Sequence, residues 1–126
     1  MKHKSDLLII GGGIVGLSTA WNYLQQFPDH RVTLIEKERQ VGLHQSGRNS
    51  GVLHSGIYYK PGSYRARLCT SGKAAMEQFC RTHEIAYDIC GKVIVAVSQA
   101  EIEGLQTIYD RGIANGVTCS MIGQER

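Results

Sequence analysis

The sequence predicts an α/β fold that begins with a single βαβ unit. Four consecutive apolar residues, Leu7 to Ile10, stop at Gly11, which is typical of a short strand buried on both faces. A second run rich in β-branched residues spans Val32 to Ile35. Two such strands joined by a helix are expected to be parallel, with a right-handed crossover. Between the runs, up to Pro28, apolar residues recur at helical spacing: Ile14, Leu17, Trp21 and Leu24.

Beyond this unit the hydrophobic pattern changes. Residues 37–62 show no period and are predicted to form a loop, after which Ser63 is a candidate N-cap of a helix that reaches about Thr82. A doubly wound sheet needs a third parallel strand beside the first, and none follows in the expected place. We therefore expect an incomplete fold that belongs to a longer protein.

The last third of the chain mixes strand and helix patterns. Lys92 to Val97 and Val117 to Ile122 are predicted strands. Between them, Ser98 and Glu101 form a candidate capping box for a helix that closes at Asn115-Gly116.

Composition excludes several classes of function. The net charge of +3 is small and scattered, so no nucleic-acid partner is predicted, and Arg65 and Arg67 are expected on a solvated helix face. The apolar stretch from Leu7 to Trp21 is too short to span a membrane. The cysteines form no Cys-x-x-Cys pair, so we expect reduced thiols in a cytosolic protein and no metal site; they are Cys69, Cys80, Cys90 and Cys119.

A glycine turn follows the first predicted strand. Gly11, Gly13 and Gly16 fit the spacing G-x-G-x-x-G, and Glu36 lies twenty residues after Gly16, at the end of the second strand. In dinucleotide sites these glycines permit a tight turn, close approach of a pyrophosphate, and packing of helix on sheet. The acid accepts hydrogen bonds from a ribose and disfavours a 2'-phosphate. A purely structural turn is the alternative, and the motif does not separate FAD from NAD.

The loop of residues 37–62 combines small residues with apolar ones. Five glycines between Gly42 and Gly62 each cost roughly 0.5–1 kcal/mol in backbone entropy relative to alanine, so something must compensate. A ligand with a wide flat ring, approached by backbone at several points, is one explanation. An irregular surface loop is the other. The polar residues available to a ligand are Ser46, Asn49, Ser50 and Ser55.

The segments DLLIIGGGIVGLSTAWNYL, VTLIEKE, HQSGRNSGVLHSGIYYKPGS and CGKVIVAV resemble the amino-terminal part of the FAD-dependent L-2-hydroxyglutarate dehydrogenases or oxidases, in the D-amino-acid-oxidase-like superfamily. The resemblance runs through the whole chain. The third segment is the most specific. Arg48 departs from the histidine expected in many relatives, and we interpret it as a solvated side chain.

The resemblance implies a Rossmann-like FAD-binding domain whose first part is residues 1–82, followed by the start of an α+β substrate domain at residues 83–126. It implies noncovalent FAD with its pyrophosphate at Gly11, Gly13 and Gly16, and its adenosine ribose at Glu36. Ser46, Asn49, Ser50 and Gly51 would lie near the ribityl chain and the flavin. The other residues expected to contact the cofactor are Ile14, Val15, Lys37 and Val52.

Relatives of this kind oxidise L-2-hydroxyglutarate, a small dicarboxylate, to 2-oxoglutarate. They pass the electrons to an acceptor such as a membrane quinone. The resemblance therefore implies a cytoplasmic protein with peripheral contact on the inner face of the cell membrane. We expect the 126-residue chain alone to bind FAD weakly and to turn over nothing.

Oxidation of a hydroxy acid needs a base for the hydroxyl proton while a hydride moves to the flavin. His54 is the candidate base, with His44 as a weaker one, and a histidine that only holds the loop is the alternative. Tyr58, Tyr59 and Lys60 are candidates for the substrate carboxylates, against roles in packing or solvation.

Two alternative functions stay open at this point. The first is a related flavoenzyme that oxidises an amine or glycerol 3-phosphate. The second is a noncatalytic nucleotide-binding remnant, because much of the substrate pocket would lie beyond Arg126.

Overall fold

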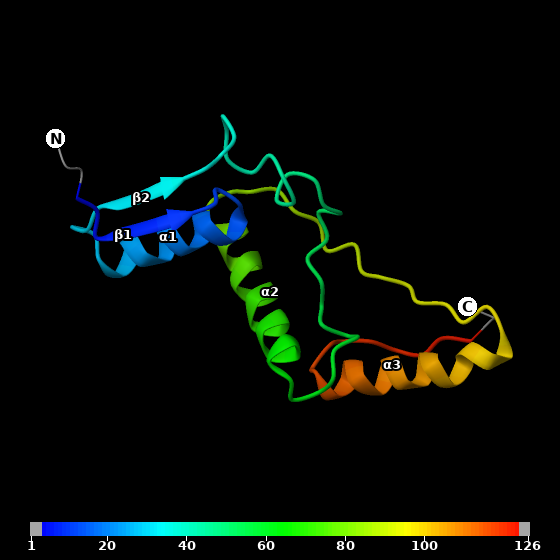
Figure 1. Cartoon of the computed structure of the whole chain (residues 1–126). Helices are drawn as coiled ribbons and strands as arrows, with labels where there is room; N and C mark the ends of the chain where they lie inside the picture. The colour runs from blue at the N-terminus through cyan, green and yellow to red at the C-terminus, as the bar shows by residue number, and fades with distance from the viewer. Residues whose placement is uncertain (1–3, 124–126) are drawn as a thin grey trace. The chain divides into compact units, whose positions relative to one another are not determined.

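The computed structural model describes residues 4–123, and its chain divides into two compact units between Val52 and Leu53 (Figure 1). This division lies inside the loop predicted over residues 37–62. The assignment of residues 1–82 and 83–126 to two domains stays a prediction. Together the units form a mixed α/β structure with one two-stranded parallel sheet and three α-helices among the described residues.

The first unit contains the predicted βαβ arrangement. Strand β1 (Leu7–Ile10) is followed by helix α1 (Ile14–Gln26) and strand β2 (Val32–Ile35). The two strands are parallel, with Leu7 opposite Val32 and Ile10 opposite Ile35. All three elements confirm the sequence prediction. Helix α1 ends at Gln26, and its C-cap, Phe27, directly precedes Pro28, a residue that cannot continue a helix.

The sheet of the first unit is covered on one face only. Ile9 and Leu34 are half-buried, and Ile9 faces the helix. On the other face Leu8 is 54% exposed, Ile10 83% and Ile35 51%. The expectation of a strand buried on both faces is therefore wrong for the described residues, because two strands and one helix provide a single covering layer.

The glycine turn lets α1 start close to the end of β1. Gly11 has φ of +107°, a backbone conformation that residues with a side chain rarely adopt. A Cβ atom on Gly16 would lie 2.0 Å from the carbonyl oxygen of Gly11 and 3.2 Å from Cγ2 of Ile9. Gly16 therefore sets how closely the helix packs on the sheet, which is the structural part of the role predicted for it.

The first helix of the second unit is α2 (Tyr64–Thr82), whose start confirms the predicted cap. The Ser63 hydroxyl oxygen accepts a hydrogen bond from the Ala66 amide at 3.2 Å, and the same hydroxyl donates to the Lys60 carbonyl at 2.6 Å. Ala66 is buried. The cap therefore fixes the helix start and the end of the preceding loop together.

Helix α3 (Ile102–Ala114) confirms the predicted end at Asn115 and Gly116, where Gly116 has φ of +73°. The predicted capping box is wrong. A short 3₁₀ turn (Gln99–Glu101) precedes α3, so the N-cap moves from Ser98 to Glu101. The Glu101 carboxylate accepts instead from the Val97 amide at 2.9 Å.

The two strands predicted over residues 92–97 and 117–122 do not form within the described residues. Val93, Val95 and Val97 are exposed, and both segments are extended but lie outside any sheet. A strand requires a partner for its ladder of hydrogen bonds, which its own apolar pattern does not supply. None of the helices in residues 4–123 is both long and apolar enough to cross a bilayer.

Gly16→Ala is predicted to destabilise the first unit by about 1–3 kcal/mol, because the new methyl group displaces α1 from β1. Urea unfolding followed by the fluorescence of Trp21, the only tryptophan in the sequence, measures this effect. Gly72→Ala in α2 is the matched control. A Cβ atom on Gly72 would have no neighbouring atom within 4 Å, so the substitution is expected to stabilise α2 by about 0.5–1 kcal/mol. Unfolding followed by far-UV circular dichroism measures this change. Equal midpoints for Gly16→Ala and the wild type would contradict this packing account.

Candidate functional site

Glu36 lies at the end of β2 and is bound to the glycine turn. One carboxylate oxygen accepts from the Gly12 amide at 2.7 Å, and the other accepts from the Glu38 amide at 3.1 Å. The hydrogen bond from Gly12, with a smaller effect from that of Glu38, holds the pKa of Glu36 below its ordinary value. The carboxylate is therefore ionised at neutral pH, at the position predicted to meet a ribose.

The side chain of Ser46, in the loop after β2, forms a hydrogen bond with the first residue of α1. Its hydroxyl oxygen accepts from the Ile14 amide at 2.7 Å, while the N-cap residue itself, Gly13, has no side chain. The Leu17 amide already bonds the Gly13 carbonyl at 3.0 Å. The amides of Val15 and Gly16 have no acceptor inside the helix, as is usual for a first turn. Ser46 is thus close to the site where the sequence predicts a pyrophosphate.

The segment between Glu38 and Ser46 has one further contact with the turn and one within itself. The Gly42 amide donates to the Gly12 carbonyl at 2.9 Å. The His44 ring nitrogen Nε2 pairs with the Glu38 carboxylate at 3.0 Å. Sequence reasoning missed Glu38 altogether, because no spacing rule connects it with His44.

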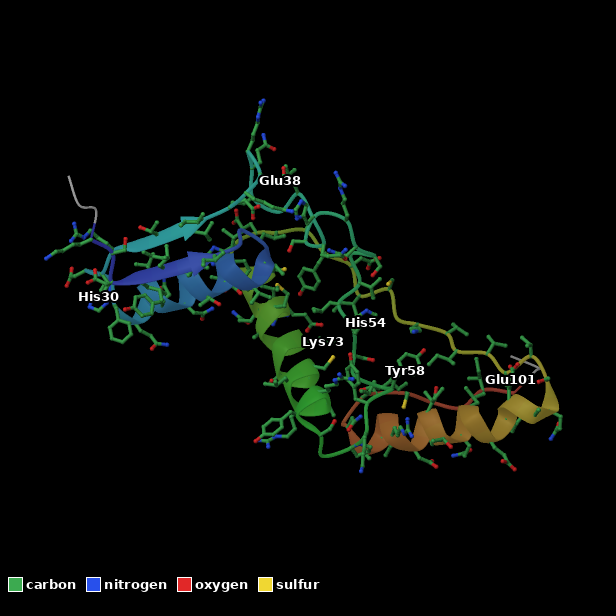
Figure 2. All side chains as sticks on the ribbon, viewed as in Figure 1. His30, Glu38, His54, Tyr58, Lys73 and Glu101 are labelled. Carbon is green, nitrogen blue, oxygen red and sulfur yellow. The ribbon has the colours of Figure 1, made fainter. Side chains whose placement is uncertain are left out.

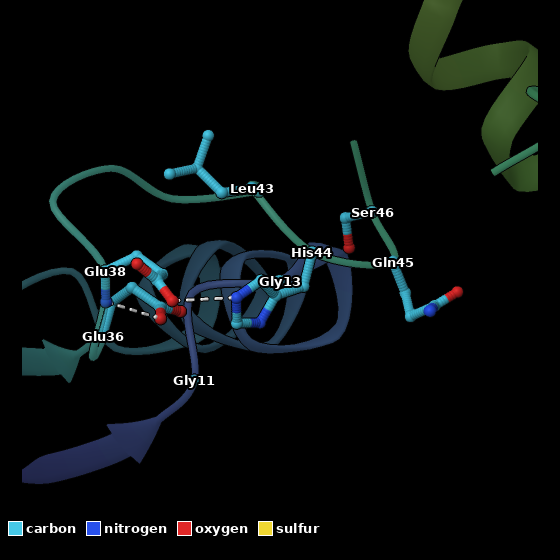
Figure 3. Close-up of a pocket in the computed structure, with 9 residues that line it drawn as sticks. Gly11, Gly13, Glu36, Glu38, Leu43, His44, Gln45 and Ser46 are labelled. Atoms are coloured by element: carbon cyan, nitrogen blue, oxygen red, sulfur yellow. Dashed lines mark hydrogen bonds and ion pairs between the residues drawn. The ribbon is translucent and has the colours of Figure 1, made fainter. Parts of the chain in front are cut away.

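These contacts border an open cavity of about 230 Å³ (Figure 3). Figure 3 shows the His44 ring directed toward Glu38 beside the turn that carries Gly11 and Gly13. Pockets that hold a drug-sized ligand usually measure about 300–1,000 Å³. The cavity therefore suits part of a dinucleotide rather than the whole. Its lining is Gly11, Gly13, Glu36, Glu38, Gly42, Leu43, His44, Gln45 and Ser46.

The remaining cofactor candidates lie outside this cavity lining. Asn49 donates from Nδ2 to the carbonyls of Gln45 and Ser46 at 2.8 and 2.9 Å, and its Oδ1 accepts from the Gly51 amide at 2.7 Å. Ser50 accepts from the Val52 amide at 3.4 Å. These side chains shape the loop itself. Ile14, Val15, Lys37 and Val52 are exposed, as is Arg48, in agreement with its interpretation as solvated.

The candidates for chemistry and substrate belong to the second unit, except His44, the weaker candidate base. Figure 2 shows His54 and Tyr58, which are both exposed. The His54 carbonyl accepts from the Cys69 thiol at 3.2 Å, which fastens the backbone and leaves the imidazole for other contacts. The Lys92 ammonium lies 4.5 Å from the centre of the Tyr58 ring, a cation–π contact. Tyr59 is half-buried and Lys60 is exposed.

Two residues that sequence reasoning missed hold the backbone of this segment. Asn115 donates from Nδ2 to the carbonyls of Gly56 and Tyr59 at 3.1 and 2.9 Å. Arg111 donates to the Tyr58 carbonyl at 3.3 Å. The Asn-Gly pair at the helix end was visible in the sequence, but it indicated a helix terminus and gave no sign of a distant loop.

The residues of the first unit fit the nucleotide end of FAD. A Cβ atom on Gly13 would lie 3.1 Å from the Ser46 hydroxyl, so glycine keeps the cavity open at that point. The helix start offers amides and a partial positive charge to phosphates, and Glu36 offers ionised oxygens to ribose hydroxyls. Each carboxylate oxygen has a second lone pair, so the bonds to Gly12 and Glu38 do not exhaust Glu36.

Known proteins resemble this chain along most of its length. Residues 6–126 match the model of the DAO family, described as FAD dependent oxidoreductase. A protein of Dictyostelium discoideum named L-2-hydroxyglutarate dehydrogenase, mitochondrial, is 50% identical over 92% of this chain and 26% of its own length. The human protein of the same name is 49% identical over 89% and 24%. L-2-hydroxyglutarate dehydrogenase of Escherichia coli (strain K12) is 47% identical over 89% and 26%.

The chain therefore spans about a quarter of the length of the curated relatives it matches. The family match, in contrast, extends over almost all of the described residues, including the glycine turn, Glu36 and the whole of the loop. The chain belongs to the DAO family of FAD-dependent oxidoreductases.

Proposed function

We propose that this chain forms the FAD-binding start of an enzyme that oxidises L-2-hydroxyglutarate to 2-oxoglutarate. The observation that carries the proposal is the joining of the glycine turn to Glu36 and Ser46, at 2.7 Å in each case. The same chain is about half identical to proteins named L-2-hydroxyglutarate dehydrogenase. The hydrogen bonds support binding of a dinucleotide, and the identity supports activity on a 2-hydroxy acid.

The βαβ unit is proposed to be the first part of a Rossmann-like domain whose other strands lie elsewhere in a longer protein. A sheet of this type is covered on both faces by helices. The exposed side chains of Leu8, Ile10 and Ile35 support the proposal, because they form an apolar sheet face that another layer would bury. Residues 1–82 and 83–126 would then begin the cofactor domain and the substrate domain.

The first unit is proposed to bind the adenosine and pyrophosphate of FAD. The amides of Val15 and Gly16 would donate to the phosphates at the positive end of α1, beside Gly11 and Gly13. Glu36 would accept from the ribose hydroxyls. Ser46, Asn49, Ser50, Gly51 and Val52 would follow the cofactor toward its ring, with Ile14 and Lys37 as further contacts.

The second unit is proposed to serve the substrate. Bound FAD supplies the acceptor for a hydride. His54 would take the hydroxyl proton, which is the role of a general base. Tyr58, Tyr59 and Lys60 would meet the two carboxylates. The ammonium of Lys92 lies against the Tyr58 ring. This contact supports the proposed carboxylate site, because Lys92 adds a second cation beside Lys60 and the substrate is a dianion.

The electrons are proposed to pass to a membrane quinone, from a cytoplasmic protein in peripheral contact with the inner face of the cell membrane. The names of the relatives give a mitochondrial location or none. A comparison of quinone with soluble dye as acceptor, using membrane and soluble fractions, tests this part by itself.

Substrate turnover tests the proposed function. The natural protein that contains this chain, loaded with FAD, would be offered L-2-hydroxyglutarate, D-2-hydroxyglutarate, glycerol 3-phosphate and D-amino acids. Oxidised flavin has an absorbance band at roughly 450 nm that reduced flavin lacks, a property of the cofactor itself. We expect this band to be lost with L-2-hydroxyglutarate alone. Bleaching by glycerol 3-phosphate or by an amine, and not by the hydroxy acid, would contradict the proposal.

His54→Gln is predicted to lower kcat by about 10²–10⁴-fold, the usual contribution of a general base, while FAD content stays at the wild-type level. Stopped-flow reduction of the flavin measures the effect. His30→Gln is the matched control, since the His30 ring bonds the Tyr23 hydroxyl at 2.7 Å in the first unit. Equal reduction rates for His54→Gln and the wild type would remove His54 from the chemistry.

Glu36→Gln is predicted to lower stability at neutral pH and to have less effect in acid. The stabilisation from the ionised carboxylate is complete above its ordinary pKa of 4.5, and is lost as the pH falls through the lower pKa of the folded chain. Urea midpoints of wild type and variant should therefore converge as the pH falls from neutral to below 4.5. Asp29→Asn, at an exposed site in the same unit, is the control. A constant gap between the curves would refute the charge argument.

A further inference from the structure

The carboxyl end of α3 holds a turn that lies more than fifty residues earlier in the chain. Asn115 bonds two carbonyls of the turn, those of Gly56 and Tyr59, which are 59 and 56 residues away. Arg111 bonds a third, that of Tyr58. The turn closes on itself through the Tyr59 amide, which donates to the Gly56 carbonyl at 3.1 Å. One helix end thus supplies donors to three of the four carbonyls between residues 56 and 59.

Close packing restricts the position of this turn on α3. Gly56 is buried with φ of +89°, and a Cβ atom there would lie 3.4 Å from Cβ of Cys69 in α2. Gly112 of α3 is also buried, and a Cβ atom on it would lie 3.0 Å from Ile57 and from the thiol of Cys119. Close-packed contacts of this kind allow little sliding. The part-buried amide of Asn115 therefore fixes the register of the turn.

The turn carries the side chains proposed for the substrate. Tyr58 and Tyr59 belong to it, and Lys60 follows directly. A carbonyl that loses its buried donor costs about 1–3 kcal/mol, so removal of the Asn115 amide favours other positions of the turn. A displacement of about 1 Å in a substrate-binding group can cost up to roughly a hundredfold in kcat/KM, and the loss appears in KM where the group only binds the substrate.

We propose that Asn115 is a positioning residue for the substrate-binding turn, acting through the carbonyls of Gly56 and Tyr59. The proposal rests on the proposed function, because it takes the substrate to be a dicarboxylate met by Tyr58, Tyr59 and Lys60. It adds α3 to the substrate site. Asn115 itself touches neither substrate nor cofactor in this assignment.

Asn115→Asp tests the proposal in the FAD-loaded natural protein. The replacement keeps the shape of the side chain. It replaces the amide nitrogen that donates to two carbonyls in the wild type with a carboxylate oxygen, which cannot donate to them. We expect KM for L-2-hydroxyglutarate to rise about tenfold, with kcat and FAD content within twofold of wild type. The matched control is Asn22→Asp in α1, where the amide donates to the Ser18 carbonyl at 2.8 Å, and its KM should not change.

A parallel fall in kcat, FAD content and thermal stability would overturn the proposal, because it would indicate a general structural role. An unchanged KM would also overturn it. If Asn115→Asp does not fold, Asn115→Ala takes its place, since it removes the donor without adding a repelling charge, and the same outcomes apply.

A second measurement separates this proposal from the proposed function. Hydrogen exchange of the Tyr59 amide should be at least about tenfold faster in Asn115→Asp than in the wild type, whether or not the protein oxidises L-2-hydroxyglutarate. If the wild type fails to oxidise the hydroxy acid but exchange is faster in Asn115→Asp, the proposed function is wrong and the positioning of the turn by Asn115 is supported. If exchange is unchanged, the positioning falls.

Discussion

The close approach of α1 to the end of β1 is the constraint on which the cofactor end of this chain depends. A side chain on Gly16 would meet the Gly11 carbonyl at 2.0 Å, so only glycine allows the helix to start there. With the helix in place, the Gly12 amide reaches Glu36 at the end of β2 and the Ile14 amide reaches Ser46 in the loop. A larger residue at position 16 would move all of these donors together.

The candidate residues are distributed unevenly over the two compact units. Those predicted to bind the cofactor precede the division after Val52, apart from Ser55, and those predicted for chemistry or substrate follow it, apart from His44. In each unit a helix end fastens a loop through side-chain hydrogen bonds. Ser46 in the loop caps the start of α1, while Asn115 at the end of α3 reaches the turn at Gly56. Both loops are thereby ordered by contacts that are distant in sequence.

Local signals in the sequence predicted local structure well. The apolar runs of β1 and β2, the helical spacing of α1, the Ser63 cap and the Asn115-Gly116 terminus each depend on neighbours within a few residues, and all were confirmed. The strands expected at residues 92–97 and 117–122 failed, since a strand depends on a partner that the described residues do not provide. The glycine turn and Glu36 were found because their spacing is fixed by the motif. Glu38 and Arg111 were missed because their contacts follow no period.

We propose that FAD lies with its nucleotide end at the glycine turn of the first unit and extends along the loop that follows β2. The most direct test is hydrogen exchange of the natural protein with and without FAD. Added FAD is expected to protect the amides of Val15 and Gly16 and those of residues 42–52, because phosphate and flavin contacts would cover both segments. Protection confined to other parts of the protein, with these amides exchanging as before, would contradict it.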